Sequence, residues 1–288
     1  MRFIITLLAF LTFFTFSYGQ QSDIAHFIPQ PLELNPAFAG SFFDYKANGY
    51  ISGYTVGRTA ISPKRMKFSS DIALKKLNSG LGLNYSAKSM DELKFKKLGL
   101  SYSYHIDLNK LNLKIGIGIQ YINDKTKIIS SWLSPENYSN GQNVYLNRLA
   151  MSGGVLLHDQ NGYISISYID QYIYADSDDV KPFGRGGFNI VSGYHFLKGG
   201  KFSFCPSAYY YINPYNDMTM QLNLKAMIVN MVWVSATICT EGYYELGAGV
   251  DFKNMSIGFR EIRPKSSDQY VSWSKLEIFA GLYFDRKE

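Results

Sequence analysis

The chain of 288 residues lacks a long apolar run beyond its amino terminus. No segment after residue 19 reaches about 18 consecutive apolar residues, the least that suggests a transmembrane helix, so a helical membrane protein is excluded. Cysteine is almost absent, since Cys205 and Cys239 are the only two. They are too few for a disulfide framework, and neither forms a CxxC pair suited to zinc or redox chemistry. Two separate thiols are favoured over a bridge.

Histidine is scarce as well, and the four residues of this type are far apart in the chain: His26, His105, His158 and His195. Their spacing matches no metal site, and the GxSxG, HExxH and P-loop motifs are absent. The sequence therefore predicts no catalytic residue, no metal ligand and no cofactor. The chain is not expected to be an enzyme.

A concentrated basic patch is also missing, although the formal net charge is +6. Lys and Arg residues are scattered through the chain, whereas nucleic-acid-binding proteins gather them on one face. No nucleic acid is therefore expected as a partner.

Residues 1–19 have the features of a secretory signal peptide. Arg2 precedes an apolar run over 3–16, and Ser17 and Gly19 supply small residues just before Gln20. The run is too short to span a bilayer, which takes roughly 20 residues, so cleavage after Gly19 is favoured over an uncleaved anchor. The absence of a cysteine at this point argues against a lipoprotein. We therefore expect an exported chain that begins with a lead-in over 20–44.

The dominant pattern after residue 44 is strict alternation of apolar and polar residues. In "KIGIGIQY" three isoleucines fall on one face, while Lys114 and Gln120 fall on the other. The stretches "GLGLNYS" and "ELGAGVDF" repeat this pattern. A period of two over eight residues is typical of a β-strand with one apolar and one polar face.

Segments of this kind recur to the end of the chain and predict an all-β protein with fourteen strands. The predicted strands are 45–55, 66–75, 79–87, 95–106, 111–123, 145–158, 162–172, 185–197, 201–212, 217–227, 231–240, 243–252, 255–262 and 273–284.

The connections between these strands mostly alternate between long and short, although the alternation weakens at 213–216 and 241–242. Those at 56–65, 88–94, 124–144, 173–184 and 263–272 are long and polar, and most of the others are tight. Tyr and Phe also cluster near strand ends, as in the aromatic girdles of membrane barrels. A soluble sandwich or propeller is the alternative, but no blade repeat of 40–50 residues is present.

Together these features predict one closed antiparallel transmembrane β-barrel of about 14 strands over 45–284, in a Gram-negative outer membrane, with a tail at 285–288. Short turns would face the periplasm and longer loops the cell exterior. The residues predicted to face lipid are Ile115, Ile117, Ile119, Leu246, Ala248 and Val250.

The polar face of the strands would line the barrel interior. By alternation it includes Lys97, Lys114, Gln120, Gln221, Asn223, Lys225, Glu245, Asp251, Lys275 and Glu277. A solvated pore wall is the simplest interpretation. A lumen of this size is, however, too wide for its own side chains to fill, so it conducts, is plugged or receives a guest. The candidate residues for binding a partner in the lumen are Lys97, Lys114, Lys225, Glu245 and Glu277.

The stretch "PLELNPAFAGS" in the lead-in resembles the start of the PorP/SprF family of type IX secretion outer-membrane proteins, where N-P-L-x-x-N-P-A-[FY]-A-G is characteristic. The matching residues are Pro31, Leu32, Asn35, Pro36, Ala37, Phe38, Ala39 and Gly40. Gln30 stands where the family usually has Asn. The last strand is also similar to the family's, since Glu277 and Ile278 fit its His-Glu-Ile pattern, with Leu276 in place of His.

The resemblance implies an integral outer-membrane protein of gliding and secreting Bacteroidota. Its expected partner is a large secreted adhesin, which it helps to export or to anchor at the surface through the adhesin's type B carboxy-terminal domain. Further expected partners are the type IX translocon, periplasmic ring or peptidoglycan-binding components, and outer-membrane lipids. A diffusion channel or small-ligand transporter remains the alternative function.

The lead-in itself allows two interpretations. Its prolines and the Asn35–Pro36 step are too broken for a helix or a central strand. They fit a rigid segment placed under or inside the barrel. They fit equally well a stiff turn into the first strand.

Overall fold

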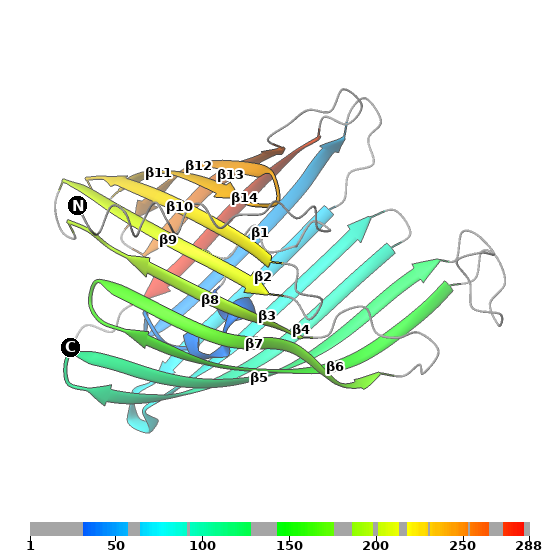
Figure 1. Ribbon diagram of the computed structural model, residues 1–288, viewed down its shortest axis with the longest axis horizontal. Helices are drawn as coiled ribbons and strands as arrows, with labels where there is room; N and C mark the ends of the chain where they lie inside the picture. Colours follow the sequence, from blue (N-terminus) through cyan, green and yellow to red (C-terminus); the bar gives the residue numbers. More distant parts are fainter. Residues whose placement is uncertain are drawn as a thin grey trace.

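The computed structural model describes residues 31–56, 64–90, 93–127, 143–175, 186–197, 201–212, 218–229, 231–252, 254–264 and 273–284. The described chain forms a closed barrel in which each strand pairs antiparallel with its neighbours in sequence (Figure 1). The strands are β1 (Tyr45–Val56), β2 (Lys64–Leu74), β3 (Ser79–Met90), β4 (Leu93–Leu108), β5 (Leu111–Lys127), β6 (Asn143–His158), β7 (Gly162–Ala175), β8 (Gly187–Tyr194), β9 (Phe202–Ile212), β10 (Met218–Ile228), β11 (Val232–Cys239), β12 (Tyr243–Phe252), β13 (Met255–Pro264) and β14 (Trp273–Phe284). The short helices are α2 (Pro31–Leu34), η1 (Pro36–Phe38) and η2 (Lys75–Leu77).

The predicted fold is confirmed, including the number of strands. One difference concerns 88–94, for which the sequence predicts a polar loop. There β3 and β4 continue until Met90 pairs with Leu93, so that only 91–92 lie between them. Barrel strands can extend past the hydrocarbon into water, where polar residues suit both faces of a strand, so polarity alone is a poor marker of a strand end. The predicted signal peptide, residues 20–30 and the tail at 285–288 lie outside the described residues.

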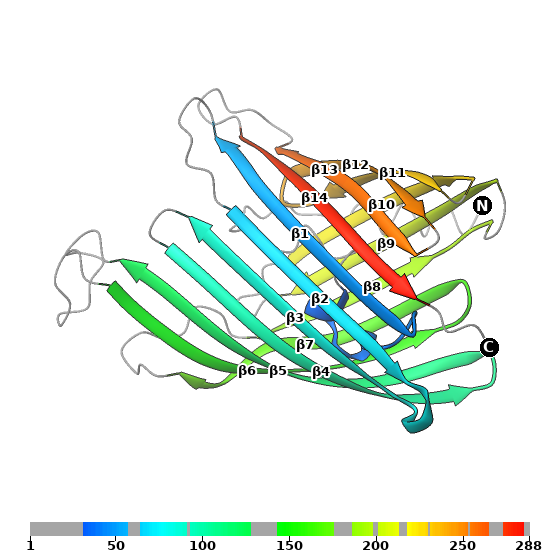
Figure 2. The same ribbon diagram turned by 180° about the vertical axis from the view of Figure 1, so that it is seen from behind.

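The barrel closes between its first and last strands. β1 and β14 pair over twelve residues, from Tyr45 opposite Phe284 to Val56 opposite Trp273. Figure 2 shows the two strands side by side along their length. Closure gives each of the strands that the structure describes a neighbour on both sides, as a lipid environment requires because hydrocarbon offers no hydrogen-bond partner.

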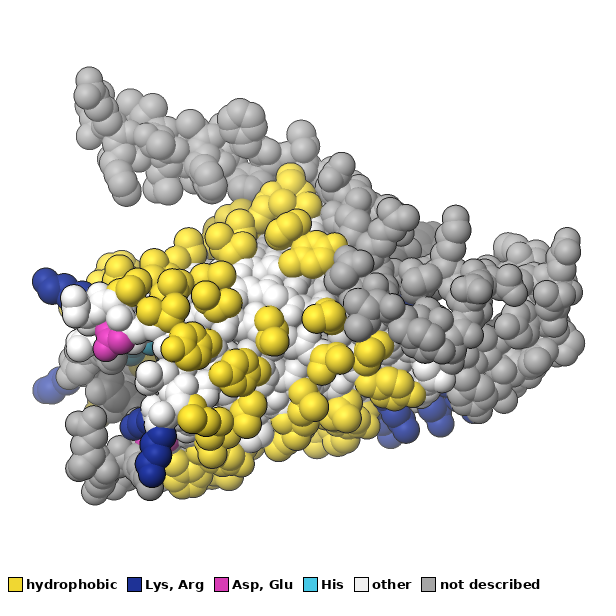
Figure 3. Space-filling model, turned by 90° about the horizontal axis from the view of Figure 1, so that it is seen from below, with side chains coloured by type: hydrophobic (Ala, Val, Ile, Leu, Met, Phe, Trp, Pro, Cys, Tyr) yellow, Lys and Arg dark blue, Asp and Glu magenta, His cyan; other side chains and the backbone are white. Residues whose placement is uncertain are grey.

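The outer surface is apolar and the interior is polar, the reverse of a soluble barrel. Ile117 is 58% exposed, and Ile115, Ile119 and Leu246 are exposed as well. Figure 3 shows hydrophobic side chains spread over one face, with Lys and Arg towards its ends. Ala248 and Val250 are half-buried on the same face of β12. This surface suits lipid contact. None of the helices in the described ranges has the length and apolarity to cross a bilayer.

The two sides of the barrel differ in the length of their strands. Strands β4 to β7 have 14 to 17 residues, whereas β8 to β13 have 8 to 11. The connections from β2 to β3, β4 to β5, β6 to β7, β8 to β9, β10 to β11 and β12 to β13 all lie at one end of the barrel, hereafter the short-turn end. Two of these turns use asparagines in the left-handed region, Asn78 (φ 46°) and Asn109 (φ 67°), a conformation that asparagine tolerates better than most residues. In outer-membrane barrels this end faces the periplasm.

Candidate functional site

Residues 31–41, hereafter the plug, lie inside the barrel towards its short-turn end (Figure 1). Asn35, Ala37 and Ala39 have no exposed surface, and η1 contacts β4, β5 and β6. The stretch from Asn35 to Gly40 is therefore not a turn on the barrel rim. It fills part of the lumen.

The box sequence explains the local shape of the plug. The Asn35 side chain accepts a hydrogen bond from the Ala37 N–H (2.8 Å) and caps η1, while Pro36 stands at the first helical position. Asparagine at the cap followed by proline is a favoured start of a helical turn. Gly40 then reverses the chain at φ 60°, where a Cβ would also lie 2.8 Å from the Ala73 Cα. Only glycine fits there without strain.

Asn35 also fixes the plug to the barrel wall. Its Nδ2 donates hydrogen bonds to the backbone carbonyls of Val155 on β6 (3.1 Å) and Ile166 on β7 (3.3 Å). One buried amide thus caps η1 and bonds to two strands, so all its polar atoms are used. Replacing it would leave several buried groups unpaired, which is costly.

Three inward-facing glycines form the seat of the plug, hereafter the glycine seat: Gly80 on β3, Gly116 on β5 and Gly154 on β6. A Cβ on Gly116 would lie 2.1 Å from the Ala37 nitrogen, and one on Gly80 would lie 2.1 Å from the Ala39 oxygen. On Gly154 it would lie 2.4 Å from Asn35 Oδ1. Glycine inside a strand often marks the close approach of another backbone. The sequence carried this signal in "GLGL" and "KIGIGI", but sequence reasoning did not use it.

Polar side chains of the wall bind the plug backbone. Ser103 Oγ donates to the Ala39 carbonyl (2.6 Å), and Ser167 Oγ donates to the Leu34 carbonyl (2.5 Å). Asp71 accepts a hydrogen bond from the Gly40 N–H (3.1 Å). These contacts satisfy backbone groups that the short helices leave open.

Two of the predicted lumen lysines lie on this side of the barrel. Lys114 on β5 donates to the Ser41 carbonyl at 3.1 Å, so it binds the plug directly. Lys97 on β4 is half-buried and acts on Glu33 of the plug through its charge. Glu33 also forms an ion pair with Lys67. Burial alone would raise the pKa of Glu33, but the charges of Lys67, Lys97 and Arg65 and the hydrogen bond from Lys67 together lower that pKa below its ordinary value of 4.5.

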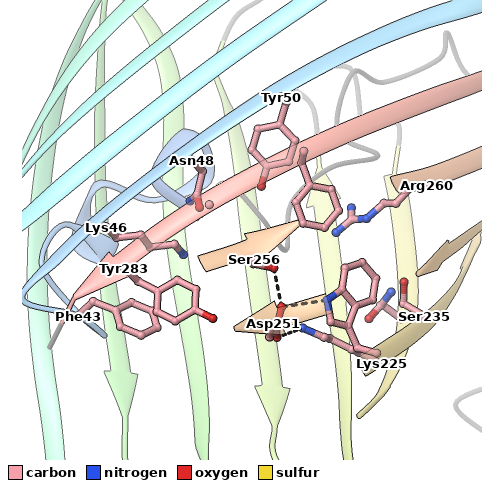
Figure 4. Close-up of a pocket in the computed structure, with 14 residues that line it drawn as sticks. Phe43, Lys46, Asn48, Tyr50, Lys225, Ser235, Asp251, Ser256, Arg260 and Tyr283 are labelled. Atoms are coloured by element: carbon pink, nitrogen blue, oxygen red, sulfur yellow. Dashed lines mark hydrogen bonds and ion pairs between the residues drawn. The ribbon is translucent and has the colours of Figure 1, made fainter. Parts of the chain in front are cut away.

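The opposite side of the lumen, formed by β1 and β10 to β14, holds a cavity of about 270 Å³, hereafter the aromatic cavity (Figure 4). Three rings form one of its walls. The Phe279 ring stacks on Tyr50 (centroids 5.6 Å apart, planes at 26°) and on Trp233 (5.5 Å, 22°). Trp233 and Phe279 belong to β11 and β14, and closure of the barrel brings Tyr50 of β1 beside Phe279.

Charged groups surround the aromatic wall. Lys225 Nζ lies 4.7 Å from the Trp233 ring centroid and 3.4 Å from Asp251 Oδ2. Asp251 Oδ1 accepts hydrogen bonds from Trp233 Nε1 (3.0 Å) and Ser256 Oγ (2.5 Å). The Arg260 guanidinium lies 5.5 Å from the Phe279 ring centroid. Figure 4 shows Arg260, Lys225 and Asp251 around the same cavity.

The two remaining predicted lumen residues lie on the same side. Glu277 on β14 is 2% exposed and forms an ion pair with Lys275 (3.2 Å). Glu245 on β12 is buried, and its Oε1 has no hydrogen-bond partner within the described ranges. The structure thus gathers Lys225, Glu245 and Glu277 on one side and leaves Lys97 and Lys114 on the plug side.

A second cavity of about 580 Å³ lies between the plug and β7 to β10. It is lined by Phe38 and Tyr163 and shares Phe43, Lys46 and Lys225 with the aromatic cavity. The two cavities are therefore neighbours beside the plug. Across the residues that the structure describes, no cluster of His, Cys, Asp and Glu suits a metal ion.

Comparisons with known proteins agree with this architecture. The family described as "Type IX secretion system membrane protein PorP/SprF" matches residues 16–278. No curated protein sequence matches the chain.

Solved structures with a similar fold are outer-membrane barrels. The Pseudomonas putida toluene transporter TodX has a TM-score of 0.55 at 10% identity, covering 90% of this chain and 95% of its own. A Pseudomonas aeruginosa FadL homologue gives 0.54 at 10% identity, with coverage of 89% and 94%. The outer membrane protein Omp33 of Acinetobacter baumannii gives 0.51 at 9%, with coverage of 85% and 100%. At such identities the likeness concerns the fold alone.

Proposed function

The chain belongs to the PorP/SprF family of type IX secretion system membrane proteins, and from this premise we propose that it is a receptor for a large exported adhesin. It binds the adhesin's type B carboxy-terminal domain and thereby helps to export the adhesin or to anchor it at the cell surface. The protein is located in the outer membrane, as its family and its barrel fold require. Its proposed role is binding, not catalysis.

The observation that carries the proposal is the division of the lumen. The plug occupies the side of β3 to β7, whereas the lumen beside β7 to β14 retains two neighbouring cavities, and buried charged side chains line both sides. A diffusion pore needs no such buried charge pairs, and a partly dry lumen makes charges costly unless they are paired. Lys225, Glu245 and Glu277 carry both signs of charge and suit a mixed polar protein surface.

The plug supports the same role from the short-turn end. It limits the depth to which a guest can enter and leaves the opposite end of the lumen for the adhesin domain. The type IX translocon, the periplasmic ring and peptidoglycan-binding components are proposed partners of the short-turn end, where the plug joins β1.

Co-purification tests the proposal most directly. A barrel with an affinity tag is extracted in detergent from the outer membrane of its own cells, and the adhesin should co-purify. Lys225→Glu should reduce both co-purified adhesin and surface adhesin seen by antibody labelling, because it places a negative charge beside Asp251. Lys110→Glu is the matched control, since Lys110 is exposed in the turn between β4 and β5. Folding is checked by the gel shift of the heated barrel.

Unchanged adhesin in the Lys225→Glu variant, with the barrel folded, would contradict a lumenal binding site. Absence of any large surface protein from the purified wild type would contradict the receptor role itself.

A channel or small-ligand transporter is the second candidate. It is supported by the function of a protein of similar fold, the toluene transporter TodX, and by the two cavities in the lumen. Planar-bilayer recordings separate the two functions. Steady conductance of the purified wild-type barrel would favour the channel, and a silent barrel would favour the receptor.

A further inference from the structure

We infer that the aromatic cavity is a binding site for a carboxylate joined to an apolar or aromatic group. We further assign this ligand to the carboxyl-terminal residue of the exported protein, which offers both groups at one chain end. The carboxylate preference rests on the cavity alone, whereas the assignment to a protein chain end rests on the proposed function.

The first argument is the charge of the cavity. Among its lining residues, Lys46, Lys225 and Arg260 are cationic and Asp251 alone is anionic. Lys225 and Asp251 form an ion pair with each other, which leaves Lys46 and Arg260 in excess among the lining residues, while Asp71 and Glu245 act on these two cations from outside the lining. A cavity with excess positive charge and little water favours an anion.

The second argument is the state of Arg260. Its side chain is only 8% exposed, yet its Nε has no hydrogen-bond partner in the described part of the chain. Glu277 lies opposite Arg260 in the register of β13 and β14, but it is paired with Lys275. A buried donor without an acceptor is costly, and a bound carboxylate would remove that cost. The planar guanidinium matches a carboxylate through two parallel hydrogen bonds.

The third argument is the aromatic wall beside that donor. Arg260 rests against Phe279, which stacks between Tyr50 and Trp233. An anion bound to Arg260 therefore has its neighbouring atoms against three rings. This surface favours an apolar or aromatic substituent over a phosphate or a free inorganic ion. The volume of about 270 Å³ admits one amino-acid residue with its carboxylate and excludes a folded domain.

The experiment uses the fluorescence of Trp233 in the full-length barrel. The chain has three tryptophans, so Trp132→Phe and Trp273→Phe leave Trp233 as the sole reporter. The purified barrel is titrated with N-acetyl-phenylalanine and with the corresponding amide. The acid should change the fluorescence in a saturable way, and the amide should bind at least about tenfold more weakly.

Arg260→Gln should abolish the difference between the acid and the amide. Arg263→Gln is the matched control, because Arg263 lies three residues away on the same strand but is exposed and paired with Glu261. Phe279→Leu is a second test that keeps Arg260, and it should weaken the acid and the amide alike. Equal binding of acid and amide to the wild-type barrel would overturn the inference.

A phenylalanine-terminated hexapeptide separates the two sources of a carboxylate. Binding of the peptide acid about tenfold tighter than N-acetyl-phenylalanine supports a protein chain end. Equal or weaker binding overturns that assignment in favour of a small free acid.

This test does not depend on the adhesin. If the adhesin co-purifies but the acid shows no preference, the inference fails and the receptor role stands. If the acid is preferred but no adhesin co-purifies, the receptor role fails, together with the assignment to its chain end.

Discussion

The two sides of the lumen differ in how the space inside the barrel is filled. A barrel of fourteen strands is too wide for its own side chains to fill. On the side of β3 to β7 three glycines leave the wall backbone bare, and a segment of the same chain packs against it. On the side of β10 to β14 glycines are present as well, but the Trp233 and Phe279 rings of neighbouring strands cover Gly249 and Gly258 and still leave a cavity. Inward glycines thus receive backbone of the plug on one side and large side chains of the wall on the other.

A substitution in the glycine seat should have the largest effect, because it removes the contact between the plug and the wall. Gly116→Val should expel the plug, because its Cβ alone would lie 2.1 Å from the Ala37 nitrogen. We expect a folded barrel that conducts in planar bilayers and whose residues 31–41 become open to protease. Gly49→Val on β1 is the control, since nothing lies within 4 Å of a Cβ there. A silent Gly116→Val barrel with a protected plug would refute the role of the seat.

On the outer, lipid-facing surface, a substitution should have the same effect on both sides of the barrel. Ile117→Arg on β5 and Leu246→Arg on β12 both place a charge against lipid, where it costs about 2–4 kcal/mol near the bilayer midplane. We expect similar losses in the free energy of unfolding, measured with urea in lipid vesicles. Leu77→Arg in η2, at the short-turn end, should cost much less. A loss confined to one side would mean that the sides face different surroundings.

Asn35 tests how firmly the plug is held. Asn35→Ala removes the cap of η1 and both hydrogen bonds to the wall, and it should weaken the seated plug by about 1–3 kcal/mol. Amide hydrogen exchange of residues 31–41 would measure this. The double change Asn35→Ala with Pro36→Ala should also reduce adhesin retention if the plug positions the guest. An effect on exchange without an effect on retention would restrict the plug to a structural role.

The smallest expected effect is a dependence on pH through Glu33. Its folded pKa lies below 4.5 because of Lys67 and Lys97, so its contribution is complete above pH 4.5 and is lost as the pH falls through the lowered pKa. The protection of the plug amides, which is the exchange rate corrected for the intrinsic pH dependence of exchange, should therefore fall only as the pH drops below the ordinary pKa of a glutamate. Glu33→Gln should remove that change. A loss of protection between pH 5 and 8 would contradict this assignment.

The fold could be predicted because it repeats a local signal. Alternation within a strand such as "KIGIGIQY" shows which residues are apolar and which are polar on its two faces. Closure of the barrel is expected because a strand edge in hydrocarbon must be paired. The number and direction of the strands could therefore be predicted without knowing any contact between distant residues. The box over Asn35 to Gly40 was noticed for the same reason, since its turn chemistry is local. Its position in the lumen was one of two open interpretations, because it depends on glycines in β3, β5 and β6.

The candidate site was predicted less completely. Alternation placed Lys114 in the lumen, but not the Ser41 carbonyl that it binds. Arg260 was missed, although "SIGFREI" alternates and puts Gly258, Arg260 and Ile262 on the inner face. Which inward charge finds a partner depends on strands that are distant in sequence, and a single sequence does not show this pairing.

The bonds of Asn35 have a consequence for how the barrel is assembled. Its amide reaches carbonyls 120 and 131 residues later in the chain, so loop-closure entropy makes this contact one of the last to form. Val155 and Ile166 face each other across β6 and β7. A slip of one residue between these strands would move one carbonyl out of reach and turn the side chains to the wrong face. The plug therefore packs in place only when β6 and β7 pair in the correct register, and a barrel with shifted strands keeps an open lumen.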